Sequence, residues 1–153
     1  FREVKWNIKD APGNLNAKIK GVKITSDNQF FYIENKIKVE IEFVNFVDNQ
    51  IVNCSVSVFD DYDSYVLASP NLERIPLAKG AFKSVCIIPE NFLNKGKYFF
   101  TIILVGNNFE IISQLDKIVS IDMDEKGLHR KDYFGHWGGM VRPYLQWENT
   151  QID

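Results

Sequence analysis

The stretch KIKVEIEF, residues 36–43, decides the fold class. Apolar side chains occupy every second position from Ile37 to Phe43, and charged side chains fill the positions between them. Because successive side chains of a strand point to opposite faces, this alternation predicts a strand with one buried and one hydrated face. The composition of the whole chain agrees, since 17 Ile and 13 Val stand against 5 Ala, and β-branched residues favour strands.

Further segments with strand character follow one another at short intervals. Turn-forming clusters such as residues 60–64 and 106–108 separate them, at a spacing of roughly 8–12 residues that is typical of sandwiches. No stretch shows the period of a long helix, and no internal repeat is visible. We therefore predict an all-β fold, an antiparallel β-sandwich of the jelly-roll or immunoglobulin-like type. The other predicted strands are 18–24, 51–60, 65–69, 81–88, 97–105, 110–114 and 117–122.

Residues 124–153 differ in composition from the rest of the chain. They hold two of the three Trp, both His and four of the nine Gly. Residues 140–147 predict one more strand, but a long connection without a clear element precedes it. Connections of this kind are typical of functional loops or of segments exchanged between subunits, so we predict an exchanged C-terminal strand. We divide the single domain into a lead-in segment 1–15, a sandwich core 16–123 and a tail 124–153.

Length and charge narrow the classes of function. A chain of 153 residues has the length of one domain. Its 18 basic and 20 acidic residues give a net charge of −2, which argues against nucleic acid or an anionic membrane surface as a partner. No apolar run approaches the roughly 20 residues that cross a bilayer. Because the sequence begins at Phe1 without Met or a signal sequence, we expect it to be part of a longer protein.

Catalytic and cofactor-binding motifs are missing from the sequence. It contains no GxxxxGK(S/T) phosphate loop, no GxSxG nucleophile elbow and no HExxH zinc motif. His129 and His136 lie in a glycine-rich segment without a nearby cysteine, which is more typical of loop histidines than of a zinc pair. Asp60, Asp61 and Asp63 begin like a calcium loop but lack its glycine and distal glutamate. We therefore predict no enzymatic activity, no metal and no cofactor.

The two cysteines lie at inward positions of predicted strands. No Trp lies between Cys54 and Cys86, although an immunoglobulin-type disulfide normally brackets a core Trp. We interpret both as buried free thiols that act as small hydrophobic residues. This interpretation fits a reducing compartment.

Outward-facing residues of two predicted strands favour a binding function. One face of strand 51–60 carries amide and hydroxyl groups in a row that ends at Phe59, and strand 97–105 adds an aromatic and a hydroxyl residue. Sugar rings stack on aromatic rings while their hydroxyls bond to polar neighbours. Trp137 joins the set because the adjacent glycines leave room for close approach. The predicted carbohydrate-binding residues are Asn53, Ser55, Ser57, Phe59, Phe99, Thr101 and Trp137.

An ordered set of short motifs resembles one family. The chain opens with Trp6-Asn7 and residues 11–14, Ala-Pro-Gly-Asn, and it closes with residues 139–147, which hold a Gly, a Val, a Pro and a Trp at fixed spacing. Between them come an Ile-Pro step at residues 88–98 and the strand 119–122. This order is similar to the C-terminal domain of Wzt-type ATP-binding subunits, which belong to ABC transporters that export O-antigen and related polysaccharides.

The resemblance implies a fold, a partner and a location. Domains of this family are β-sandwiches that form homodimers by exchanging a C-terminal strand, and they bind the polysaccharide before export. The implied partners are the glycan, the nucleotide-binding domain of the same chain and a transmembrane permease subunit. The implied location is cytoplasmic, at the inner face of the inner membrane, in lipopolysaccharide biosynthesis. The matching motifs are structural, so no ligand residue is carried over from the family.

We therefore predict a carbohydrate-binding domain that selects a glycan for export. Two other classes stay open. The first is an immunoglobulin-like module that binds protein or only dimerises, which a polar, well-hydrated outer sheet with no response to glycans would favour. The second is an accessory lectin module or a glycoside hydrolase, which would need two Asp or Glu carboxyls in one cleft.

Overall fold

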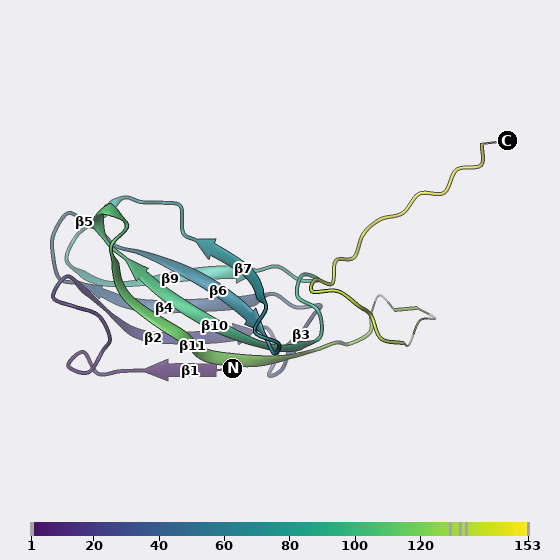
Figure 1. The fold of residues 1–153 in the computed structure, drawn as a ribbon, viewed down its shortest axis with the longest axis horizontal. Helices are drawn as coiled ribbons and strands as arrows, with labels where there is room; N and C mark the ends of the chain where they lie inside the picture. The colour runs from purple at the N-terminus through teal and green to yellow at the C-terminus, as the bar shows by residue number, and fades with distance from the viewer. Residues whose placement is uncertain (1, 129, 132, 134, 153) are drawn as a thin grey trace.

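Two sheets face each other across an apolar core (Figure 1). The computed structural model describes residues 2–128, 130–131, 133 and 135–152. In the four-stranded sheet the order is β1-β2-β4-β9, and all neighbouring strands are antiparallel. Its strands are β1 (Arg2–Lys5), β2 (Ala17–Ser26), β4 (Ile37–Asn45) and β9 (Gly80–Ile88).

The second sheet has five strands in the order β3-β11-β10-β6-β7, with β3 parallel to β11 and the other pairs antiparallel. A single 3₁₀ turn, Asn107–Phe109, joins β10 to β11. The predicted all-β sandwich is confirmed. The strands of this sheet are β3 (Phe31–Tyr32), β6 (Asn53–Asp60), β7 (Tyr65–Pro70), β10 (Gly96–Val105) and β11 (Ile111–Asp124), while β5 (Gln50–Ile51) and β8 (Pro76–Leu77) form a separate ribbon.

The core forms from the alternating apolar positions. In β4 the inward residues from Ile37 to Phe43 are all buried, as the alternation in this stretch predicts. They belong to one apolar cluster with Phe100, Ile102 and Leu104 of β10, each of which has no exposed surface. Residues 99, 101 and 103 of β10 therefore lie on the outer side of the five-stranded sheet, because side chains alternate along a strand.

Strand β11 is longer than the sequence predicts. The two predicted strands 110–114 and 117–122 form one continuous strand, Ile111–Asp124. At the gap between the two predicted strands, the pairing of β11 with β10 shifts its register opposite residues 100–102. Lys117 adopts a positive φ of 48° at this point. A bulge of this kind lets one strand cross the whole sheet while a side chain is redirected locally.

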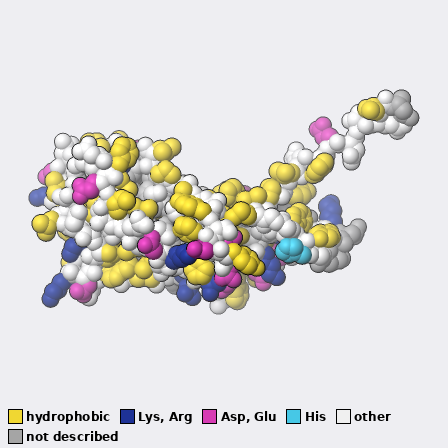
Figure 2. All heavy atoms as spheres, viewed as in Figure 1, with side chains coloured by type: hydrophobic (Ala, Val, Ile, Leu, Met, Phe, Trp, Pro, Cys, Tyr) yellow, Lys and Arg dark blue, Asp and Glu magenta, His cyan; other side chains and the backbone are white. Residues whose placement is uncertain are grey.

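The tail does not continue as a strand within its own sandwich, contrary to the predicted strand 140–147. A single bridge pairs Val141 with Leu93, and the Arg142 N–H donates to the Phe92 carbonyl at 2.6 Å. Beyond Arg142 the chain runs away from the sandwich (Figure 1), and hydrophobic side chains occur along this arm (Figure 2). The described residues 143–152 thus lie outside both sheets of their own chain.

Among the residues that the structure describes, no helix has the length and apolar character that a bilayer crossing requires.

Replacing Phe100 by Ala tests the core. Phe100 is fully buried, so the change should lower the free energy of unfolding by about 3–5 kcal/mol, as for other buried Phe residues. The matched control is Ile87→Ala on β9, where the side chain is 56% exposed and the expected loss is about 0.5 kcal/mol. Denaturant unfolding measures both values, and equal losses would contradict this core assignment.

Candidate functional site

Two aromatic residues lie side by side on the outer side of the five-stranded sheet. The β6–β10 register pairs Phe59 with Phe99, and both side chains are half-buried. The ring of Tyr65, at the start of β7, lies 4.7 Å from that of Phe59. Lys117 extends over both Phe rings, with its Nζ 5.4 Å from the Phe59 centroid and 5.8 Å from that of Phe99. We call Phe59, Tyr65, Phe99 and Lys117 the aromatic face.

The bulge in β11 positions Lys117 over these rings. Its backbone N–H donates to Thr101 Oγ1 at 3.0 Å, and its ammonium group forms an ion pair with Asp63. Cations are attracted to the faces of aromatic rings, so these contacts hold the lysine across the pair of Phe residues. Lys97 Nζ also lies 5.5 Å from the Phe99 centroid. The aromatic face therefore combines flat apolar surface with cationic hydrogen-bond donors.

Two of the predicted hydroxyl residues lie beneath this surface. Ser57 and Thr101 are paired in the β6–β10 register, and only 4% and 3% of their surfaces are exposed. The Ser57 hydroxyl shares a 2.8 Å hydrogen bond with the Tyr65 hydroxyl, and Thr101 accepts the bond from Lys117. The structure therefore brings Ser57, Thr101, Phe59 and Phe99 together, but the two small hydroxyls already serve protein contacts.

Asn53 and Ser55 lie further along β6, away from the aromatic pair. Asn53 is six residues from Phe59, which is about 20 Å along a strand. It is 5% exposed, its amide donates to the Asn71 carbonyl, and its carbonyl oxygen accepts from the Cys54 N–H at 3.2 Å. The alternation of side chains along a strand predicts the face on which Asn53 lies. It does not predict that the loop after β7 covers Asn53 on that face.

Trp137 belongs to a different site at the base of the tail. It lines a cavity of about 410 Å³ between the β9–β10 loop and the tail. We call this cavity the tail pocket, and its lining residues are Asn94, Lys95, Glu125, Arg130, Gly135, His136, Trp137 and Arg142.

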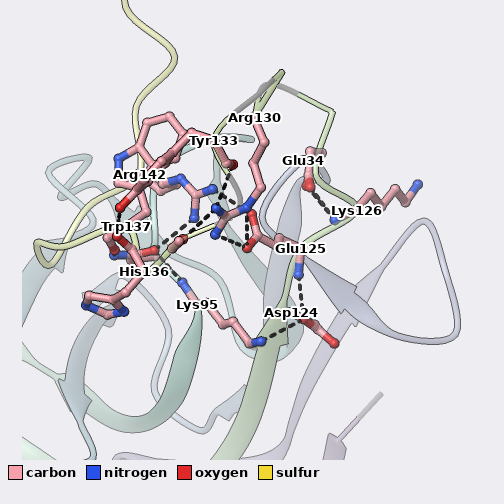
Figure 3. A network of polar contacts seen from close by, with 12 residues as sticks. Glu34, Lys95, Asp124, Glu125, Lys126, Arg130, Tyr133, His136, Trp137 and Arg142 are labelled. Carbon is pink, nitrogen blue, oxygen red and sulfur yellow. Dashed lines mark hydrogen bonds and ion pairs between the residues drawn. The ribbon is translucent and has the colours of Figure 1, made fainter.

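One carboxylate holds the tail pocket together. Glu125 accepts hydrogen bonds from Arg130 Nε at 2.8 Å and from Arg142 Nη2 at 2.5 Å, each on a different carboxylate oxygen. Figure 3 shows it between the two guanidinium groups. The hydrogen bond from Arg130, and then the Arg142 contacts, hold the pKa of Glu125 below its usual value, although burial opposes this.

The Trp137 ring is fixed by neighbours from both ends of the pocket. The Arg142 guanidinium carbon lies 4.0 Å from the ring centroid, and the Tyr133 ring meets it edge-on at 6.3 Å. The Asn94 amide donates to the backbone carbonyls of Trp137 and Gly139 at 2.8 and 2.7 Å. These contacts fasten the tail to the β9–β10 loop.

No pattern in the sequence predicts several residues of these two sites. Lys117 and Tyr65 approach the Phe rings through a bulge and a strand pairing, and neither has a sequence signature. Glu125 and Arg142 are 17 residues apart in a segment without periodicity. The sequence signals that point to this segment are the unusual composition of residues 124–153 and the glycines around Trp137.

Neither cysteine belongs to the aromatic face or to the lining of the tail pocket. Cys54 and Cys86 are free thiols, and burial raises the pKa of Cys54 to about 12, so that this thiol stays neutral. Within the described ranges, His, Cys, Asp and Glu side chains form no group of three or more that could hold a metal ion. His129 falls outside the residues that the structure describes.

Known proteins share the architecture rather than the sequence of this chain. No protein-family model and no curated protein matches it. The crystal structure of the C-terminal domain of Wzt superposes with a TM-score of 0.70 at 13% identity, covering 98% of this chain and 89% of that chain. The chain has the fold of the Wzt C-terminal domain. A Niemann-Pick type C2 protein from the Japanese carpenter ant superposes with a TM-score of 0.50 at 15% identity, over 75% of this chain and 98% of that one.

Acidification tests the role of Glu125. Its pKa is lower when the tail is fastened than when it is released, so the carboxylate stabilises attachment above its ordinary pKa of about 4.3. This stabilisation should be lost as the pH falls through the lowered value. We expect the NMR signals of the Trp137 indole and the Asn94 side chain to move toward released-tail positions as the pH falls below the ordinary carboxyl pKa and through the lowered one. Glu125→Gln should produce the same positions at pH 7, and unchanged signals in that variant would refute the role.

Proposed function

We propose that this chain is a glycan-binding domain that selects a polysaccharide for export by an ABC transporter. The observation that carries the proposal is the superposition on the Wzt C-terminal domain, which extends over nearly the whole of both chains. The ordered motifs from Trp6 to Trp147 support the same family by an independent route.

The aromatic face has the chemistry that a sugar chain requires. The rings of Phe59 and Phe99 offer an apolar platform of about two ring widths, on which the C–H faces of pyranose rings can lie. The Lys117 ammonium, which lies over both rings, and the Tyr65 hydroxyl beside Phe59 can bond to sugar hydroxyls. Tyr65 is 59% exposed, so the site is open to solvent and suits a long polymer that passes across it.

Selective binding is the whole mechanism that we propose for this domain. An open site of this kind should bind weakly, with a dissociation constant between high micromolar and millimolar, or about −4 to −6 kcal/mol. Two such sites on one dimer would raise the apparent affinity for a polymer without any new contact.

A homodimer formed through the tail is part of the proposal. Leu145, Trp147 and Ile152 are 65%, 87% and 95% exposed in the single chain. Exposed apolar residues that follow one another along a segment are typical of surfaces that a partner covers. Exchange of residues 143–153 between two copies would bury them. The further partners in this proposal are a nucleotide-binding domain of the same protein and a membrane permease, at the cytoplasmic side of the inner membrane.

The rival module that only dimerises makes a different use of the same tail. It needs the exchanged segment but no glycan, and its aromatic face would show no response to any polysaccharide. A hydrolase would instead release sugar from the polymer. Binding and turnover assays on one polysaccharide panel therefore separate the three classes.

Replacing Phe99 by Ala tests the aromatic face. The loss of one stacking platform should weaken glycan binding at least tenfold and leave the fold intact, because Phe99 is an outer-side residue. Affinity electrophoresis against the surface polysaccharides of the source organism, with unrelated glycans as controls, measures the change.

Phe109→Ala is the matched control for this experiment. Phe109 is 73% exposed in the turn at the far end of β10, so this variant should bind like the parent. Normal glycan binding by the Phe99 variant together with a sharply lower melting temperature would make Phe99 a packing residue and remove the proposed site.

Ending the chain at Arg142 tests exchange. This truncation keeps the Glu125–Arg142 contact but removes residues 143–153, so the sandwich should remain folded and become monomeric. Light scattering measures the mass. In the full chain, Trp147→Ser should weaken the dimer, whereas Leu15→Ser, at an equally exposed position outside the tail, should not. A truncated chain that is still dimeric would rule out exchange.

A further inference from the structure

We propose that the tail pocket binds an acidic group of the exported glycan, a carboxylate or a phosphate carried on a sugar ring. This inference rests on the proposed function and adds a second binding site to it, apart from the aromatic face. It also gives the ligand a chemical class, because a neutral sugar would gain little from the charges that line this cavity.

The charges in the tail pocket are unbalanced. Lys95, Arg130 and Arg142 line the cavity, and Glu125 is the carboxylate among its lining residues. Asp124 lies nearby, with its Oδ1 3.6 Å from Lys95 Nζ, but both side chains are about two thirds exposed and such pairs are weak. The cavity thus carries an excess of positive charge in a chain whose net charge is −2.

The guanidinium of Arg142 is held in position by the protein without a ligand. Arg142 is 7% exposed, and its guanidinium donates to Glu125 on one side and to Asn94 Oδ1 at 3.1 Å on another. The Trp137 ring covers it at 4.0 Å. A side chain held in this way loses little further entropy when it binds, so its charge favours an anion more than that of a free surface arginine would.

Glu125 cannot neutralise both arginines. Each of its carboxylate oxygens already accepts a hydrogen bond from a different guanidinium, so one negative charge serves two positive charges. Figure 3 shows this shared arrangement beside His136 and Lys95. A second anion in the cavity would complete the charge balance, and charge-assisted hydrogen bonds of this type are stronger than neutral ones.

The size and walls of the pocket suit a sugar that carries such a group. Its volume of about 410 Å³ lies within the roughly 300–1,000 Å³ of small-molecule sites. Trp137 supplies an apolar wall for the ring, next to the cations that would meet the acid. Lys95 also precedes Phe99 by four residues, which is at most about 14 Å of chain, so one glycan can reach from the pocket to the aromatic face.

A titration of the ¹⁵N-labelled full chain tests the pocket with four probes. These are methyl β-glucuronide, glucose 6-phosphate, methyl β-glucoside and inorganic phosphate. The glucuronide and the sugar phosphate should shift the Trp137 indole and Lys95 signals and bind at least tenfold more tightly than the neutral glucoside. The first two probes distinguish carboxylate from phosphate, and inorganic phosphate shows whether the ring contributes.

Lys95→Met is the decisive variant because Lys95 lies outside the Glu125–Arg142 contact and its loss leaves the tail fastened. Binding of the acidic probes should fall about tenfold, or about 1.4 kcal/mol. Lys83→Met is the matched control, since Lys83 is also an exposed lysine with a loose carboxylate partner, Glu40 at 4.0 Å on the outer side of the other sheet. This control should leave probe binding unchanged.

Three results would overturn the inference. They are equal binding of the neutral glucoside, no effect of Lys95→Met on the acidic probes, and no shift in the pocket with any probe. Each result would mean that Arg130 and Arg142 only fasten the tail to the sandwich. Failure of the proposed function gives a different pattern, in which acidic probes still shift the pocket but no polysaccharide perturbs Phe59 or Phe99.

Discussion

The burial of one apolar face from each sheet is the constraint on which the rest of the molecule depends. Alternate residues of β4 and β10 lie in a single core cluster with almost no exposed surface. Because side chains alternate, filling the core also fixes which residues stand on the outer side. The adjacency of Phe59 and Phe99 follows from this, since each flanks buried residues of its own strand and the β6–β10 register pairs them. The aromatic face is thus a consequence of core packing.

The tail obeys a different kind of constraint. It contributes little to the core, and a charged network fastens it to the sandwich. Glu125 follows directly on β11 and joins two arginines of the tail, while Asn94 binds the tail backbone from the β9–β10 loop. Buried charges require partners, so these contacts specify one position for residues 135–142. Beyond Arg142 the chain leaves the sandwich (Figure 1).

The two candidate surfaces divide glycan recognition between them in our proposal. The aromatic face offers stacking and few fixed polar groups, which suits the repeated part of a polymer. The tail pocket offers fixed charge in a confined space, which suits one distinctive group on it. Since both sites are individually weak, joining them through one ligand, and doubling them in a dimer, would give selectivity that neither provides alone. In this proposal the tail up to Arg142 takes part in glycan recognition, and residues 143–153 form the dimer.

The sequence by itself determined the fold class, most strand positions and the outward direction of Phe59 and Phe99, because a two-residue period is a local property that packing preserves. It also marked residues 124–153 as different, and Trp137 within them. Only the tertiary structure decided that Asn53, Ser57 and Thr101 are covered, and that Lys117 lies across the Phe rings. The assembly of Glu125, Arg130 and Arg142 around Trp137 was likewise beyond the sequence. The covering of a side chain and the pairing of charges depend on contacts between segments that are distant along the chain. A local sequence pattern does not indicate which of these segments come into contact.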